Sequence, residues 1–154
     1  MCPISVIITP NIVEFHRLIA TYCPSLSSTG LGLGYLSRTL LATLNIGGII
    51  VKGATDTITT PTASLTCAAN GGLKRCGGLG DVLAGVVTAL TTYYSIHSGG
   101  KTRTGIELQH VLYAACAISR EAQRRAFVKH GRAMDANHVV EEIAPLMNEL
   151  WPPF

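Results

Sequence analysis

The segment with the clearest chemical potential runs from Arg75 to Gly85, where three glycines lie in the four residues before Asp81. An apolar helical run, residues 82–90, follows at once, so we expect a helix to begin at Asp81. A glycine-rich turn that opens a helix presents free N–H groups and the positive end of the helix dipole, and such a point binds anions. A carboxylate held there can take a proton from a hydroxyl that attacks a phosphoryl group. Lys74 and Arg75 add positive charge just upstream.

The same segment also has a purely structural interpretation. Asp81 would then be only the N-cap of the helix, and the glycines would form only a turn. Short glycine motifs have many false positives, so this motif alone does not decide between a cap and a catalytic base.

Composition narrows the class of protein. The chain has 154 residues, 47% of them apolar and only 14% charged, which suits one compact domain with its own core. The net charge of +3 is small, and no basic run or interleaved aromatic pattern points to nucleic acid. We see no apolar run of membrane-spanning length and no basic region typical of a signal peptide, so no membrane partner is expected.

The cysteines and histidines lack metal-site spacing. Five scattered cysteines without a CxxC pair favour reduced thiols in an intracellular protein over a disulfide frame or a zinc site. The five histidines show no HxxH or HExxH spacing, so we expect no protein metal site. The cysteines are Cys2, Cys23, Cys67, Cys76 and Cys116.

The first half of the chain alternates strand and helix signals. Residues 4–8 form a β-branched run typical of a strand buried on both faces, and residues 12–22 read as a helix capped by Asn11 with Glu14 three residues on. A second amphipathic helix is expected over 31–44, ended by Asn45, and a second buried strand over 49–51. Residues 57–60 and 64–68 suggest a hairpin around Pro61.

The second half is helical. After the helix that follows Asp81, residues 97–103 form a polar loop, and a capping-box pattern at 104–107 opens a helix that ends near Gly131. Asp135 is expected to cap a last helix, which Pro145 should kink or split. The order of elements is that of an α/β layer architecture.

Three motifs, in order, resemble the ATP-dependent NAD(P)H-hydrate dehydratases of the ribokinase-like superfamily. Residues 9–18, TPNIVEFHRL, resemble the family's TPN-x-x-EF-x-RL segment. Residues 52–56, KGATD, resemble its KG-x-x-D segment, and residues 75–81, RCGGLGD, resemble its RCGG-x-GD loop. The resemblance covers roughly residues 4–143. It implies a ribokinase-like α/β fold, with a central, mostly parallel sheet flanked by helices.

The resemblance also implies that the chain lacks part of the family's domain. Family members have a further N-terminal half with more parallel strands, so residues 1–154 are expected to be one partial domain, the C-terminal half. The strand at residues 4–8 would then leave one hydrogen-bonding edge bare, and such an edge favours self-association. We therefore expect the isolated chain to be aggregation-prone or partly molten.

The implied reaction is the repair of hydrated nicotinamide nucleotides. ATP phosphorylates the C6 hydroxyl of (S)-NAD(P)H-hydrate, phosphate leaves, and NADH or NADPH is restored; Mg²⁺ would arrive with the nucleotide. The resemblance further implies an NAD(P)H-hydrate epimerase as functional partner and a cytoplasmic or mitochondrial location, and it leaves a homo-oligomer open.

The resemblance assigns site residues as well, with Asp81 as the catalytic base. The implied ATP contacts are Lys52, Gly53, Ala54, Thr55, Asp56, Gly71, Gly72, Leu73, Lys74, Arg75, Cys76, Gly77, Gly78, Leu79 and Gly80. The implied substrate contacts are Asn11, Ile12, Val13, Glu14, Phe15, His16, Arg17 and Asp81.

Structural alternatives stand beside several of these assignments. Lys52 could be a solvated strand end, and Glu14 and Arg17 could form an ordinary surface ion pair. Cys76 reads as a small loop filler, because no neighbouring base would activate it.

Two other classes of function remain open. A vitamin or sugar kinase of the same superfamily shares the GxGD chemistry, and a non-enzymatic remnant would bind nucleotide or nothing. The Arg75–Gly78 segment and the KG-x-x-D segment favour the dehydratase over the kinase.

Overall fold

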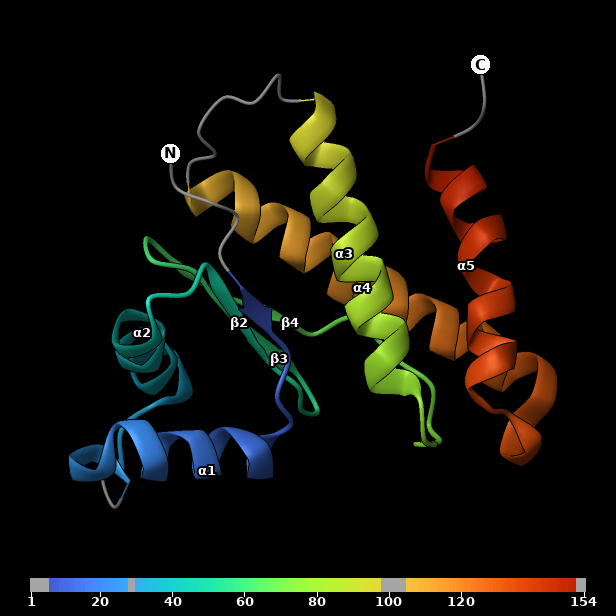
Figure 1. The fold of residues 1–154 in the computed structure, drawn as a ribbon. Helices are drawn as coiled ribbons and strands as arrows, with labels where there is room; N and C mark the ends of the chain where they lie inside the picture. The colour runs from blue at the N-terminus through green and yellow to red at the C-terminus, as the bar shows by residue number, and fades with distance from the viewer. Residues whose placement is uncertain (1–5, 28–29, 98–104, 152–154) are drawn as a thin grey trace.

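The chain folds into a four-stranded sheet with helices on both faces. A computed structural model describes residues 6–27, 30–97 and 105–151 (Figure 1). The predicted α/β architecture is confirmed. The strands are β1 (Ile7–Ile8), β2 (Gly48–Val51), β3 (Asp56–Thr59) and β4 (Ser64–Cys67). The helices are α1 (Ile12–Tyr22), α2 (Leu33–Leu44), α3 (Leu79–His97), α4 (Gly105–His130) and α5 (Ala136–Leu150), with short 3₁₀ turns at Pro24–Leu26 and Gly131–Ala133.

The sheet is mixed rather than mostly parallel. Its order is β1-β2-β3-β4, and only the β1–β2 pair is parallel. The predicted hairpin is confirmed: β3 pairs antiparallel with both β2 and β4, with Ile50 opposite Ile58 and Ile58 opposite Leu65. Tight connections explain the difference, because a short turn can join only antiparallel neighbours, whereas parallel pairing needs a long crossover such as α1 and α2.

Two cores lie on opposite faces of this sheet. Ile49 and Val51 of β2 point into the core shared with α1 and α2. Ile50 and Ile58 point the other way, into the core shared with α3, α4 and α5. Figure 1 shows the resulting three layers, with α1 and α2 on one side of the strands and the three later helices on the other. This alternation is the period-two pattern of a strand that is buried on both faces.

Local capping signals set the helix boundaries well. The predicted α1 is confirmed: the Asn11 Oδ1 accepts the N–H groups of Val13 and Glu14, both at 2.9 Å, and the Glu14 carboxylate accepts the Asn11 N–H at 2.7 Å. Asn45 ends α2 in the left-handed conformation, at φ 51°. Asp135 caps α5 as predicted, and Pro145 lies inside that helix without splitting it.

The first strand differs from the expectation. Ile7 and Ile8 are only half-buried, and Val6 is 62% exposed, so the described part of this strand is not buried on both faces. Strand β1 is the edge of the sheet as described, which explains the partial exposure. Residues 4 and 5 and most of the predicted 97–103 loop lie outside the described residues, and self-association of the isolated chain stays a prediction.

The expectation that the chain has no apolar run of membrane-spanning length is wrong for helix α3. Residues Leu79–Ile96 form one helix that is long and apolar enough by composition alone, with 17% of this stretch buried. A single helix of this kind is weak evidence for a membrane span. In the fold, Leu83, Val86 and Val87 pack into the core shared with α4 and α5.

Replacing Asn11 tests the contribution of the capping box. Asn11→Ala removes the oxygen that accepts two N–H groups, and losing such a cap costs about 1 kcal/mol. For a chain of this size that should lower the melting temperature by about 2–4 °C in a thermal melt. Asn11→Asp should change little, because Asp caps a helix as well as Asn does. Equal melting of the alanine variant and the wild type would show that the box adds nothing.

Candidate active site

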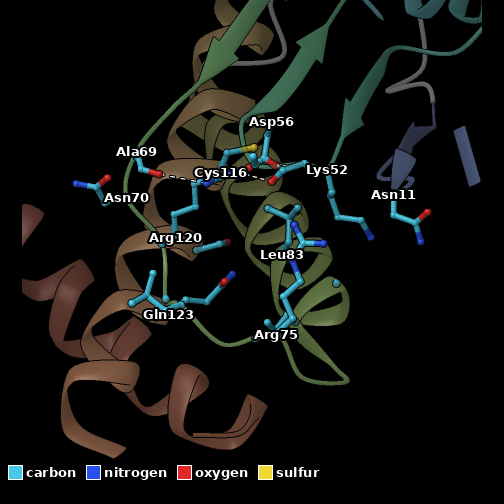
Figure 2. A pocket seen from close by; sticks show the side chains of 18 of the residues that line it. Asn11, Lys52, Asp56, Ala69, Asn70, Arg75, Leu83, Cys116, Arg120 and Gln123 are labelled. Atoms are coloured by element: carbon cyan, nitrogen blue, oxygen red, sulfur yellow. Dashed lines mark hydrogen bonds and ion pairs between the residues drawn. The ribbon is translucent and has the colours of Figure 1, made fainter. Parts of the chain in front are cut away.

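Three parts of the chain enclose a pocket of about 600 Å³ at the carboxyl end of β2. Its walls are the β2–β3 turn, the β4–α3 loop with the start of α3, and the middle of α4 (Figure 2). The lining residues are Asn11, Lys52, Gly53, Ala54, Asp56, Ala68, Ala69, Asn70, Gly71, Gly72, Leu73, Arg75, Cys76, Leu79, Gly80, Leu83, Cys116, Ser119, Arg120 and Gln123. In α/β sheets, ligands bind beyond the carboxyl ends of the strands, so this location is that of a ligand site.

Lys52 is carried into the pocket by β2. Its N–H donates to the carbonyl of Pro10 at 2.9 Å, which continues the parallel pairing past β1 and brings Asn11 alongside. The ammonium lies so close to Gly80 that a Cβ at that glycine would sit 3.1 Å from the Lys52 Nζ. Gly80 is the second residue of α3, so a lysine ammonium adjoins a helix N-terminus. Both features favour a bound anion.

The glycine-rich loop is fixed to the far end of the domain. The Lys74 ammonium donates to the carbonyls of Arg132 and Met134, at 2.6 and 2.7 Å. Gly78 adopts φ 87°, and a Cβ there would meet the Ala136 Cβ at 2.9 Å, so only glycine fits. The loop is therefore held against the start of α5, and the Lys74 charge is directed at backbone carbonyls rather than into the pocket.

Arg120 of α4 joins the walls of the pocket. Its Nε donates to the Asp56 Oδ2 at 2.7 Å, its Nη1 to the Ala69 carbonyl at 3.2 Å and its Nη2 to the Gly53 carbonyl at 3.0 Å. The hydrogen bond to Asp56 raises the pKa of Arg120 above its ordinary value, against the opposing effect of burial. Figure 2 shows the guanidinium between Asp56 and Ala69.

One hydroxyl in the pocket wall has no partner within the described part of the chain. Ser119 is 2% exposed, and its Oγ makes no hydrogen bond to any described residue. A buried hydroxyl without a partner carries an uncompensated desolvation cost. Because Ser119 lines the pocket, a ligand or water bound there can supply the missing bond.

The thiol of Cys116, which also lines the pocket, is not a nucleophile. Burial, and then the negative charge of Asp56, raise the pKa of Cys116 far above its ordinary value, so the thiol stays protonated. Cys23, Cys67, Cys76 and Cys116, the four cysteines that the structure describes, are unpaired, and their reduced state stays a prediction. Among the described residues no group of three His, Cys, Asp or Glu side chains is arranged to hold a metal ion.

Most of the residues expected to contact ATP come together in this pocket. Those that line it are Lys52, Gly53, Ala54, Asp56, Gly71, Gly72, Leu73, Arg75, Cys76, Leu79 and Gly80. Thr55, Lys74, Gly77 and Gly78 belong to the same segments but do not line the pocket.

Asp81 lies just outside the pocket, and its place in the helix differs from the expectation. Helix α3 begins at Leu79, with the Val82 N–H donating to the Gly78 carbonyl at 3.0 Å, so Asp81 is the third helical residue and not the N-cap. Its side chain is exposed. Within the glycine-rich loop, Gly78 alone has a positive φ and turns the chain into α3. Leu79 and Gly80 are therefore already helical.

The residues expected to contact the substrate are spread over two surfaces. Asn11 lines the pocket, whereas Glu14 and Arg17 line a second hollow of about 530 Å³ on the α1 side, with Thr9 and Tyr22. Phe15 is completely buried in the α1–α2 core, so its ring packs and offers no surface to a substrate. Ile12, Val13 and His16 are exposed on α1 and line neither hollow.

Sequence reasoning missed the α4 wall of the pocket. The missed lining residues on α4 are Cys116, Ser119, Arg120 and Gln123, and those missed elsewhere are Ala68, Ala69, Asn70 and Leu83. One available signal was the helical spacing of Ser119, Arg120 and Gln123 with Cys116. Polar residues at this spacing interrupt a helix face that otherwise packs into the core.

Comparison with known proteins agrees with this geometry. A family model described as NAD(P)H-hydrate dehydratase matches residues 3–145, which is most of the chain. This chain belongs to the NAD(P)H-hydrate dehydratase family. The expected resemblance is thereby confirmed.

Individual relatives match over almost the whole chain. It is 28% identical to the ATP-dependent (S)-NAD(P)H-hydrate dehydratase of Homo sapiens, over 94% of this chain and 42% of the human protein. The proteins of the same name from Bos taurus and Caenorhabditis elegans are 32% and 33% identical, over 94% of this chain and 44% and 48% of their own lengths. The chain thus spans less than half the length of the curated relatives it matches.

A solved structure supports the fold. The crystal structure of a hypothetical protein from Streptococcus mutans superposes with a TM-score of 0.66 at 20% identity, over 94% of this chain and 46% of that one. At this identity the likeness shows the shared architecture, consistent with part of a ribokinase-like fold.

Removing the Ser119 hydroxyl should change the stability of the ligand-free protein and its stabilisation by ATP in opposite directions. Ser119→Ala removes an unsatisfied buried group, so the melting temperature without ligand should stay equal or rise. If the hydroxyl bonds a ligand in the pocket, the rise in melting temperature caused by ATP should become smaller. The matched control is Ser37→Ala, since Ser37 is also fully buried without a described partner but lies on α2, away from the pocket. An unchanged ATP effect in Ser119→Ala would remove Ser119 from the ligand site.

Proposed function

We propose that this chain carries the ATP site and the catalytic base of an ATP-dependent (S)-NAD(P)H-hydrate dehydratase. The observation that carries the proposal is the approach of the Lys52 ammonium to Gly80 at the start of α3. Family membership supports this assignment, because the curated relatives bear that name. The reaction would return hydrated NADH or NADPH to the intact nucleotide, with ADP and phosphate as the other products.

The pocket fits the triphosphate of ATP. The first N–H groups of α3, at Leu79, Gly80 and Asp81, precede the first bonded turn and are free to bind an anion. Lys52 adds a cation beside them, and Gly80 leaves room for a phosphate oxygen to approach the backbone. The remaining wall along α4, with the unsatisfied Ser119 hydroxyl, is available to the rest of the nucleotide. Bound Mg²⁺ would neutralise charge on the phosphates.

Under this proposal Asp81 acts as the base. It follows Gly80 directly on α3 and is exposed, so a hydroxyl compound can reach its carboxylate while the phosphates lie against Gly80. The carboxylate accepts the proton of the C6 hydroxyl. At the same time the hydroxyl oxygen bonds to the γ-phosphorus of ATP, and the bond between this phosphorus and ADP breaks. The C6–O bond then breaks with loss of phosphate, and loss of a proton from C5 restores the ring double bond.

Other parts of the activity extend this proposal. Asn11 borders both Lys52 and the pocket, so the TPN segment is suited to hold the second substrate near Asp81. An NAD(P)H-hydrate epimerase as functional partner and a cytoplasmic or mitochondrial location belong to the same proposal.

Nucleotide binding is tested by removing the Lys52 charge. ATP with Mg²⁺ should raise the melting temperature, because a ligand that binds only the folded state stabilises it by mass action. Lys52→Met should reduce that rise. Arg38→Met, on the exposed side of α2, removes a positive charge far from the pocket and should leave the rise intact. The absence of any shift with millimolar ATP in the wild type would contradict the ATP site.

Removal of the Asp81 carboxylate tests the chemistry in the natural full-length protein. Asp81→Asn keeps the size of the side chain but removes the base, and loss of a general base typically costs a factor of about 10²–10⁴ in rate. Recovery of absorbance at the nicotinamide band, from hydrated NADPH and ATP, should therefore collapse, while the affinity for ATP stays near that of the wild type.

One control variant and one further measurement sharpen the Asp81 experiment. Glu141→Gln makes the same kind of change on an exposed face of α5 and should leave turnover normal. A phosphorylated product that accumulates without recovery of NADPH would indicate a kinase instead of a dehydratase. Near-normal turnover of Asp81→Asn would leave Asp81 as a residue of the helix start only.

A further inference from the structure

We propose that Arg120 is the positioning residue of this nucleotide pocket, and that Asp56 supports this arrangement without contacting the nucleotide. The inference rests on the proposed ATP site and deepens it. The guanidinium would hold the β2–β3 turn, and with it Lys52, at a fixed distance from the β4–α3 loop.

Arg120 contacts segments that are far from it in the sequence. Its three hydrogen bonds reach the carboxylate of Asp56 and the carbonyls of Gly53 and Ala69, which are 64, 67 and 51 residues away in sequence. Gly53 and Asp56 belong to one wall of the pocket, Ala69 to a second and Arg120 itself to a third. One side chain therefore ties together all three segments whose spacing defines the pocket.

Both carboxylate oxygens of Asp56 accept hydrogen bonds from protein groups. Its Oδ2 accepts from Arg120, and its Oδ1 accepts the Gly53 N–H at 3.1 Å, which closes the turn that follows Lys52. The side chains of Arg120 and Asp56 are only 13% and 9% exposed. A buried carboxylate with both oxygens bonded is suited to shape the turn, not to contact the nucleotide.

An arginine is needed for this geometry. The planar guanidinium offers separate N–H groups that reach one carboxylate and two carbonyls on different segments at once. A lysine at this position could restore the charge pairing with Asp56, but its single ammonium could not span Gly53 and Ala69 together. Arg120→Lys therefore separates the ion pair from the two carbonyl contacts.

The neighbouring arginines provide the contrast. Arg124, one turn along α4, forks onto Glu121 at the surface, and its side chain is 45% exposed. It does not line the pocket. Exposed pairs of this kind contribute little to stability, so Arg124→Met serves as a control that removes a whole positive charge from the same helix outside the pocket.

Loss of the Arg120 hydrogen bonds should affect ATP binding more than catalysis. Lys52 moves with the turn that Arg120 holds, whereas Asp81 and the start of α3 are anchored separately by Lys74 and Gly78. Loss of the two carbonyl contacts from this charged group should therefore raise the Kd for ATP about tenfold or more.

The first experiment compares Arg120→Lys with Arg124→Met and the wild type in the full-length protein. Isothermal titration with ATP and Mg²⁺ gives Kd, and steady-state recovery of NADPH gives KM and kcat. We expect Arg120→Lys to raise Kd and KM for ATP about tenfold with kcat within a few-fold of wild type. Arg124→Met should change neither. Equal Kd values for Arg120→Lys and the wild type would overturn the inference.

A double variant separates positioning from simple stability. Arg120→Met or Asp56→Asn alone leaves a buried charge without its partner and should lower the melting temperature, whereas the combined variant leaves no unpaired charge and should recover part of that loss. ATP affinity should stay weak in the combined variant, because the turn and the loop are still untied. Recovery of ATP affinity together with the melting temperature would show that the pair is merely structural and would overturn the inference.

The outcomes also separate this inference from the proposed function. Failure of the wild type to bind ATP refutes both. ATP binding that depends on Arg120 without any recovery of NADPH refutes the dehydratase reaction and leaves the positioning role of Arg120 intact.

Discussion

The double burial of β2 is the constraint on which the rest of the structure depends. Its residues Gly48–Val51 are buried, with Ile49 and Val51 in one core and Ile50 in the other. A shift of one residue along this strand would exchange the two faces, so the register is strongly fixed. Even Gly48 has little freedom, because a Cβ there would lie 3.0 Å from the Leu112 Cδ1. Lys52 follows this fixed strand directly, so the strand determines where the backbone of Lys52 leaves the sheet and the turn held by Arg120 begins.

Apolar packing positions the strands and helices, but it cannot position the loops. The segments that form the pocket are rich in glycine and alanine and bury few large side chains. They are held instead by two cations: Arg120 reaches from α4 to the carbonyls of Gly53 and Ala69, and Lys74 reaches from the glycine-rich loop to the carbonyls of Arg132 and Met134. Charge-assisted hydrogen bonds to carbonyls are directional, so they fix a loop where a hydrophobic contact would let it slide.

Local signals in the sequence predicted local structure well, and distant contacts were beyond them. The capping boxes at Asn11 and Asp135 and the hairpin around Pro61 were readable because every group involved lies within a few residues. The start of α3 was placed too late because the run Gly77–Gly80 resembles one continuous turn, whereas only Gly78 needs a positive φ.

The same limit applies to the site. The motifs indicated the turn at Lys52 and the glycine-rich loop, because resemblance to a family acts on contiguous residues. Arg120 and Ser119 carry no motif, and their importance comes only from contacts with segments at least 50 residues away or from burial beside a pocket. The sheet expected to be mostly parallel is mixed in the described strands because β3 pairs antiparallel with both of its neighbours, β2 and β4.

The position of Asp81 divides the proposed reaction between two environments. Gly80 lines the pocket and Asp81 does not, although the two are adjacent on α3. Successive helix positions point in directions about 100° apart, so the phosphates can lie on the pocket side of the helix start while the carboxylate faces outward. Under the proposed function, the hydroxyl compound must therefore approach from the exposed side of α3, where Asp81 stands, and meet the γ-phosphate at the rim of the pocket. The nucleotide and the second substrate thus need not compete for one cavity, and the boundary between them is the single peptide that joins Gly80 to Asp81.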